Sequence, residues 1–157
     1  MRRSDREVTE LQQILRIVDG AKILHLGLLD EGCPYVVPMH YGYEYKDGAL
    51  IFYLHGAREG HKLDLIRRNP SVCVELECET ALLSGGDDPC RYSAAFASVI
   101  GRGRAELPDD PAQKAEALRR LMLHQTGRDF VIRPEMTAAV AVIRLVIPDF
   151  TAKQRRA

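Results

Sequence analysis

The stretch CPYVVPMHYGYEYKDGALIFYLH, residues 33–55, decides which fold the chain can adopt. Over residues 33–45 every second side chain is aromatic or apolar, and this period of two is typical of a strand. Pro38 cannot donate a hydrogen bond to a neighbouring strand, and Gly42 weakens strand pairing. We therefore expect this strand to contain a bulge, or to border an opening where something other than a strand approaches its backbone.

The tripeptide Lys46-Asp47-Gly48 follows this strand and predicts a tight hairpin turn. An Asp-Gly pair supplies the positive φ angles that short hairpin turns require. The apolar residues 49–55 then form the second strand of the hairpin, so the sheet is expected to be antiparallel here.

Outward from this hairpin, side-chain spacing and chain breakers define the other elements. A helix is predicted over residues 4–19, because Ser4 can cap it with Glu7 and apolar side chains recur there at helical spacing. Further helices are predicted over residues 60–68 and from Asp110 to the residue before Gly127. Further strands are predicted over residues 22–29, 71–79, 91–106 and 139–147.

The order of these elements indicates the fold class. Strands and helices do not alternate regularly, which a doubly wound parallel sheet would require. We expect a mainly β fold of the α+β type, a six-stranded antiparallel barrel with three peripheral helices. The length of 157 residues fits a single domain over residues 1–157.

Composition limits the function classes. Hydrophobic residues make up 46% and charged residues 28%, which is typical of a globular domain. Lys plus Arg and Asp plus Glu are both 22, so no net field favours nucleic acid or a membrane as a partner. The charged N-terminus lacks the apolar segment of a signal peptide, and we expect a cytoplasmic protein. The four cysteines have no metal-site spacing and are predicted to be free, mostly buried thiols.

Residues 55–62, HGAREGHK, are the strongest candidate for a ligand site. Gly56 and Gly60 let a ligand approach the backbone, and the loop opens a helix whose free N–H groups favour an anion. His61 and Lys62 add positive charge there. The residues alone leave two interpretations open: a phosphate site, or an ordinary strand-to-helix connection with solvated basic side chains.

Other clusters are better explained without a ligand. Gly101-Arg102-Gly103 lacks the third glycine of a dinucleotide fingerprint and lies within a strand. The remaining groups are predicted to be solvated or structural, and no metal site is expected: Glu75, Glu77 and Glu79, the terminal Lys153, Arg155 and Arg156, and the histidines His25, His40 and His124.

Five motifs in order give a family resemblance. They are PYVVPMHYGY at residues 34–43, FYLHGAREGHK at 52–62, LIRRNP at 65–70, SVIGRGRA at 98–105 and TAK at 151–153. In these motifs the chain resembles the flavin-binding split-barrel superfamily of pyridoxamine 5′-phosphate oxidase, and within it the 5-nitroimidazole resistance (Nim) branch. The resemblance implies a split β-barrel and a homodimer that binds FMN at the subunit interface.

The resemblance also assigns site residues. The backbone of Val37, Pro38 and Met39 would lie along the flavin ring, while His55, Gly56 and Ala57 would line the pocket. Gly60, His61 and Lys62 would hold the phosphate. Ser98, Val99 and Gly101 would form the neighbouring strand, and Lys153, together with Arg91, would come from a partner subunit or the rim.

The function implied by this resemblance is redox chemistry carried by the flavin. Reduced FMN would pass electrons to a small acceptor such as a nitroaromatic or a quinone, with His55 as the candidate catalytic proton donor. Two other classes stay open: a non-catalytic flavin carrier or sensor, and a split barrel that binds haem or deazaflavin.

Overall fold

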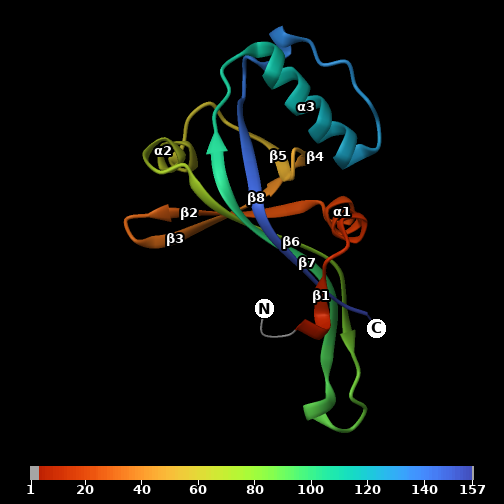
Figure 1. Ribbon diagram of the computed structural model, residues 1–157. Helices are drawn as coiled ribbons and strands as arrows, with labels where there is room; N and C mark the ends of the chain where they lie inside the picture. The colour runs from red at the N-terminus through yellow and green to blue at the C-terminus, as the bar shows by residue number, and fades with distance from the viewer. Residues whose placement is uncertain (1–3, 157) are drawn as a thin grey trace.

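The computed structural model describes residues 4–156, which form one antiparallel sheet with helices packed around it (Figure 1). The sheet order is β3-β2-β6-β7-β8-β5-β4, and β1 pairs with β8. The strands are β1 (Glu7–Val8), β2 (Ile23–Asp30), β3 (Cys33–His40), β4 (Gly42–Lys46), β5 (Ala49–Gly56), β6 (Ser71–Leu83), β7 (Ser93–Glu106) and β8 (Ala141–Arg155). The α-helices are α1 (Leu11–Gly20), α2 (His61–Arg68) and α3 (Pro111–Thr126). Short 3₁₀ turns are formed by Ser4–Arg6, Pro89–Arg91 and Pro134–Thr137.

The long strand predicted over residues 33–45 is divided at Tyr41. Before this residue, β3 pairs with β2, and after it, β4 pairs with β5 at the opposite end of the sheet order. The fully buried Tyr41 hydroxyl donates to the carbonyl oxygens of Val18 (2.6 Å) and Ala21 (3.0 Å). The opening expected from Pro38 and Gly42 is thus the place where the chain changes strand partners.

Strand β5 lies at the centre of the packing. Its residues Ala49 to Leu54 are all buried, because both faces are covered. Phe52 and Leu54 belong to the main core with Leu145, whereas Tyr53 packs against α3 in a smaller cluster. Burying one such large side chain contributes about 1.5–3 kcal/mol to folding.

The predicted helix over residues 4–19 is wrong in its first part. Glu7 and Val8 form β1, opposite Lys153 and Ala152 of β8, and α1 begins only at Leu11. Val8 is 8% exposed, so burial of this side chain against the sheet is favoured over the expected cap at Ser4. The predicted start and end of α3 are confirmed: the Asp110 side chain accepts from the Gln113 amide (2.9 Å), and Gly127 is left-handed.

The last strand is longer than the apolar run that predicted it. β8 extends to Arg155, with Lys153 opposite Ser98 and Arg155 opposite Phe96 on β7. The basic residues predicted to be a solvated end are therefore paired through their backbone, except Arg156. An apolar run identifies only the part of a strand that is buried on both faces.

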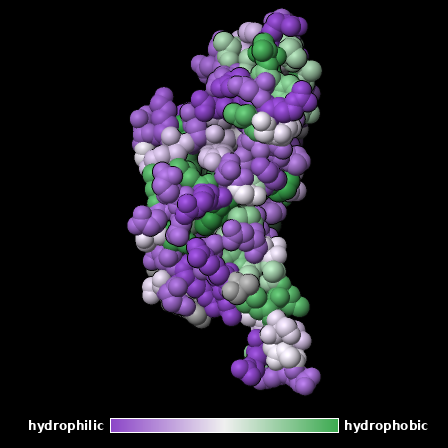
Figure 2. Space-filling view, turned by 90° about the vertical axis from the view of Figure 1, so that its right-hand side faces the viewer, coloured by the Kyte–Doolittle hydropathy of each residue, from purple (hydrophilic) through white to green (hydrophobic). Residues whose placement is uncertain are grey.

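The hairpin of β6 and β7 projects from the body of the protein (Figure 1). Leu82 near its tip is 76% exposed, and Tyr92 is also exposed; Figure 2 shows hydrophobic residues on this projecting part. We call it the arm, residues 79–95. Neither helix α1 nor helix α3 covers its outer end.

The cysteine prediction is half correct. All four thiols are free, but Cys33, Cys73 and Cys90 are exposed rather than buried. They lie on edge or solvent-facing positions of the sheet and at the arm's tip, where alternation places side chains outside the core. None of the helices formed by residues 4–156 has the length and hydrophobicity needed to cross a bilayer.

Candidate functional site

The open edge of β3 forms one wall of the candidate site. β3 is the terminal strand of the sheet order and pairs with β2. Between β4 and β5 the register places Gly42 opposite Tyr53. His40 lies two residues before Gly42, and His55 lies two residues after Tyr53. The two histidines are therefore level with each other, just beyond the end of the β4–β5 ladder. We call the region bounded by His40, His55 and the start of α2 the slot.

The start of α2 forms the second wall of the slot. Gly60, with φ of 140°, precedes the helix in a conformation that favours glycine. Its carbonyl accepts from the amides of Leu63 (2.9 Å) and Asp64 (3.3 Å). The amides of His61 and Lys62 precede these in the first turn, where a helix has no backbone acceptors of its own. Such amides favour an anion.

Lys62 brings an uncompensated positive charge to the slot. Its half-buried Nζ lies 3.7 Å from the Met39 sulfur. A Cβ at Gly56 would lie 3.3 Å from Nζ, so glycine there leaves room beside the ammonium. Among residues 4–156 no carboxylate lies within ion-pair distance of Lys62. A fully buried cation almost always has such a partner, and Lys62 is half-buried without one.

His55 is a neutral imidazole beside this charge. Partial burial, then the positive charges of His40 and Lys62, lower the pKa of His55 below its usual value. The ring is exposed at the surface of the protein, so a small molecule can reach it. His55, His40 and Lys62 thus form a group of basic side chains that lowers the local cost of binding an anion.

The His61 side chain, predicted to hold the phosphate, has a carboxylate partner in the structure. Its Nε2 lies 2.7 Å from Asp30 Oδ2, and its ring meets the Tyr35 ring edge-on with centroids 5.1 Å apart. Arg68 also approaches Asp30, at 3.6 Å. The imidazole therefore fastens α2 to the turn between β2 and β3, and only the His61 backbone amide remains for an anion.

The predicted residues of β7 and β8 lie elsewhere in the chain. Ser98 is directly opposite Lys153, on the face away from the core, whereas Val99 is buried within it. Lys153 lies on the same strand as Val142, the partner of His55, but about 35 Å of extended chain separates them. Across the sheet, the register places Val99 level with Met39 through Leu76 and Leu24, so β7 is three strands away from β3.

Gly101 has a structural reason of its own. A side chain there would collide with the Ile147 side chain and lie 3.2 Å from the Asp149 carbonyl oxygen. The glycine lets β8 cross closely over β7, next to a register shift at Arg102 and Arg104. Its presence does not require a ligand.

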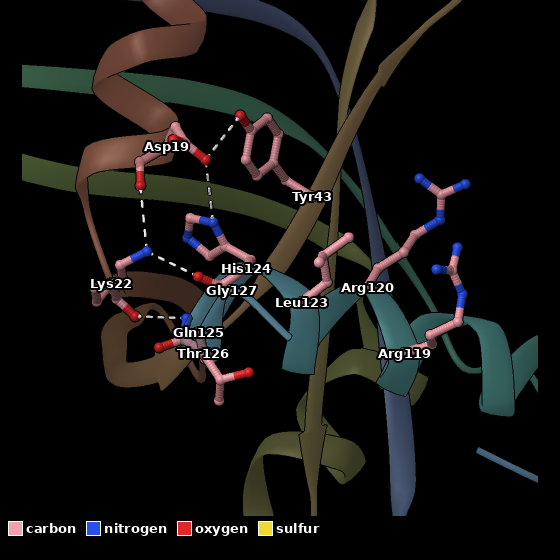
Figure 3. A pocket seen from close by; sticks show the side chains of 10 residues that line it. All are labelled: Asp19, Lys22, Tyr43, Arg119, Arg120, Leu123, His124, Gln125, Thr126 and Gly127. Atoms are coloured by element: carbon pink, nitrogen blue, oxygen red, sulfur yellow. Dashed lines mark hydrogen bonds and ion pairs between the residues drawn. The ribbon is translucent and has the colours of Figure 1, made fainter. Parts of the chain in front are cut away.

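A hollow of about 640 Å³ lies between the carboxyl ends of α1 and α3 (Figure 3). The Lys22 ammonium donates to the His124 carbonyl oxygen (2.8 Å), and the Tyr43 hydroxyl donates to Asp19 (3.4 Å). Burial and the Asp19 carboxylate raise the pKa of Tyr43 to about 12, so this phenol stays protonated.

The His124 ring is 4% exposed, and its Nε2 lies 3.0 Å from the Ala21 carbonyl oxygen. We call Asp19, Lys22, Tyr43 and His124 the seam. Because these groups bind one another, the seam joins two helices and lacks the free charge of the slot.

The sequence profile of the pyridoxamine 5′-phosphate oxidase family matches residues 10–154. The chain belongs to this family. No curated protein sequence matches the chain significantly. A solved protein from Bacteroides thetaiotaomicron VPI-5482, described as a candidate 5-nitroimidazole antibiotic resistance protein, is 32% identical, covers 94% of this chain and 85% of its own, and has a TM-score of 0.79.

More distant structures share the fold of this pyridoxamine 5′-phosphate oxidase family member. A flavocytochrome from Azotobacter vinelandii is 24% identical, with 100% of this chain and 72% of its own covered and a TM-score of 0.79. An FAD-binding protein from Mesorhizobium loti is 22% identical, with 96% and 98% covered and a TM-score of 0.65. The predicted mainly β split barrel is confirmed, with one predicted strand divided and the short β1 added.

In this pyridoxamine 5′-phosphate oxidase family member the structure adds two residues that sequence reasoning missed. His40 was predicted to be structural but borders the slot, and Gln125 at the end of α3 holds it: His40 Nδ1 and Gln125 Oε1 are 3.0 Å apart. The hairpin turn carried a signal for His40, because counting pairs outward from Lys46 and Ala49 places His40 level with His55. No local signal marks Gln125.

Proposed function

We propose that the chain binds FMN in the slot and acts as an FMN-dependent oxidoreductase that reduces small acceptors such as nitroaromatics or quinones. The observation that carries this proposal is Lys62, a half-buried ammonium with no carboxylate partner among residues 4–156. A phosphate ester would supply the missing negative charge, and the amides at the start of α2 would share it. The likeness to a candidate nitroimidazole resistance protein and to an FAD-binding protein supports a flavin here.

The chain's own residues would divide the binding between them. The open edge of β3, at Val37, Pro38 and Met39, would face the flavin ring, because backbone groups there have no second strand. His55, Gly56 and Ala57 would line the pocket, and Gly60 and Lys62 would hold the phosphate. When bound, FMN supplies the hydride or electron transfer. The protein would orient it and exclude water.

We also propose that the protein is a homodimer and that a second copy completes the site. Among residues 4–156 neither Ser98 nor Lys153 is hydrogen-bonded or ion-paired to His40, His55 or Lys62, and the resemblance assigns Lys153 to a partner subunit or the rim. The arm exposes Leu82 and Tyr92 without a covering layer, and a two-stranded ribbon is marginally stable alone. A second copy that covers the arm could place Ser98, Lys153 and Arg91 at the slot.

The proposal is tested by FMN titration of purified protein and of Lys62→Glu. Wild-type protein is expected to bind one FMN per subunit, and Lys62→Glu is expected to bind about 100-fold more weakly, because a like charge replaces a charge-assisted contact. Lys46→Glu, a substitution of the exposed lysine in the β4–β5 turn, is the matched control and should bind normally. Equal affinity of Lys62→Glu and wild type would remove the phosphate assignment.

Turnover distinguishes an enzyme from a carrier. With a reduced nicotinamide and a nitroaromatic acceptor, the FMN-loaded protein should exceed the rate of free FMN at equal concentration. Binding without such an excess would indicate a non-catalytic carrier or sensor. If the purified protein showed a Soret band in place of flavin absorbance, the ligand would be haem. Deazaflavin fluorescence would identify the ligand as a deazaflavin.

A further inference from the structure

The orientation of the Gln125 amide is fixed by its neighbours. Its Nε2 donates to the carbonyl oxygens of Tyr41 (2.8 Å) and Lys22 (3.1 Å). A flipped amide would place its oxygen against these two acceptors, so the network excludes the flip. The amide oxygen must therefore face His40, 3.0 Å from Nδ1.

This orientation fixes the tautomer of His40. Because Gln125 Oε1 can only accept, His40 Nδ1 must carry a hydrogen in both the neutral and the charged ring. The atom that gains and loses a proton is then Nε2. His40 is exposed, so Nε2 can exchange protons with solvent and with a small molecule in the slot.

The groups around His40 decide which imidazole of the slot holds a proton. His55 from β5 interacts electrostatically with His40 and with Lys62 from α2, while α3 contributes the uncharged Gln125 to His40 and β2 places Ile23 opposite it. The pKa of His55 is lowered by partial burial and then by the positive charges of His40 and Lys62. Two neighbouring imidazoles take up protons in separate steps, and burial disfavours the protonated form of His55.

We propose that His40 is the proton donor of the slot, through Nε2–H, and that Gln125 is its positioning residue. The inference rests on the proposed function and refines it, because it moves the proton from His55 to His40. A two-electron reduction of a nitro group or quinone takes up two protons. Bound FMN would supply both electrons and one of these protons as hydride, and the other proton would leave His40 Nε2, where an N–H bond breaks and an O–H bond forms on the acceptor. Neutral His40 regains its proton from water.

The tautomer is tested on the flavin-free protein by ¹⁵N-detected NMR of the histidine rings. His40 is expected to show a protonated Nδ1 and an unprotonated Nε2 at a pH where the ring is neutral. Gln125→Leu should lose this preference, whereas Thr126→Val, which alters the next side chain of α3, should keep it. A protonated Nε2 in the neutral wild-type ring, or an unchanged tautomer in Gln125→Leu, would overturn the assignment. This measurement does not depend on flavin binding, so it separates the inference from the proposed function.

Kinetics on the FMN-loaded protein test the donor itself. His40→Gln, assayed at saturating FMN, should lower kcat about 100-fold, as expected when a general acid is removed, with the KM for the acceptor little changed. The rate of the wild-type protein is expected to fall toward high pH as the donor loses its proton. His40→Gln should abolish this fall, and His55→Gln should retain it. Gln125→Leu should move this limb of the pH profile, which a merely structural defect would not do.

The matched control is His25→Gln, a histidine bonded to Glu75 on the sheet surface, and it should behave as wild type. Loss of the limb in His55→Gln and its retention in His40→Gln would assign the proton to His55 instead and refute the proposal. Failure of FMN titration with wild-type protein would refute the proposed function and leave the NMR result standing.

Discussion

The slot and the seam meet at the carboxyl end of α3, and they differ in how their charges are balanced. In the seam, Lys22 donates to a carbonyl oxygen and Tyr43 to a carboxylate. In the slot, the Met39 sulfur is the only hydrogen-bond partner of the Lys62 ammonium among residues 4–156, and the pKa of His55 is lowered. The seam has a hollow of about 640 Å³, and its polar groups bind each other except His124 Nδ1, which lies 3.6 Å from Asp19 without a hydrogen bond. Unbalanced charge, more than volume, indicates where a ligand is needed.

The largest expected effect concerns Gly42, where the slot and the seam adjoin. A side chain at Gly42 would collide with the α3 backbone at Leu121. The helix backbone cannot easily move aside, because protein interiors are closely packed. Gly42→Val should destabilise the protein by about 3 kcal/mol or more. Urea unfolding would measure this, with Gly48→Ala in the turn as a milder comparison. Unchanged stability would show that α3 is not packed here.

The seam is expected to depend on the Tyr41 hydroxyl. Its two acceptors, the carbonyl oxygens of Val18 and Ala21, are at the end of α1. Tyr41→Phe should cost about 2 kcal/mol, since it leaves buried carbonyl groups without their donor. Thermal unfolding would give the difference. FMN affinity should change little, and a loss of affinity larger than the loss of stability would show that the two regions are coupled.

The slot is expected to need the space beside Lys62. Gly56→Val would place side-chain carbons next to Nζ, where the phosphate is proposed to bind. FMN should bind about tenfold more weakly, which corresponds to about 1.4 kcal/mol. Stability should not fall, because valine suits a strand. Normal affinity in this variant would place the phosphate on another side of the ammonium.

The smallest expected effect is the pH dependence of stability that comes from His55 and His124, the two histidines whose pKa is lowered. Burial and Lys22 lower the pKa of His124, and burial, His40 and Lys62 lower that of His55. In each case the unfolded state, with a pKa near 6.5, binds a proton more readily than the folded state. Stability from both residues is therefore present above about pH 6.5 and is lost as the pH falls through the folded-state pKa.

Bound FMN should act on only one of these histidines. A phosphate near Lys62 would raise the pKa of His55 toward its usual value, whereas that of His124 should not move. NMR titration with and without FMN would show this. Equal pKa shifts of His55 and His124 would indicate a change of the whole structure on FMN binding, and not a local effect of the phosphate.

The sequence allowed the barrel and the strand-to-helix loop after His55 to be predicted because their signals are local. Alternation over residues 33–45, the Asp47-Gly48 turn and the capping of α3 at Asp110 each depend on nearby residues. The loop after His55 was identified through glycines and cations, and the structure places Lys62 beside Gly56.

What could not be predicted depends on contacts between distant residues. Val8 pairs with Ala152 in a strand where a helix start was expected. The His61 imidazole lies within hydrogen-bond distance of the Asp30 carboxylate. Gln125 holds His40 across 85 positions of sequence. No pattern within a short window encodes such contacts, since tertiary packing selects among the local possibilities.

Tyr41 is a single residue at which the chain leaves one neighbour for another. An insertion of one residue immediately before it would exchange the inward and outward side chains of β3 relative to β4, while the Tyr41 anchor kept β4 in place. The open edge of β3 could therefore diverge among relatives without rebuilding the rest of the barrel. The flavin proposed to lie along this edge would then meet different side chains on an unchanged barrel.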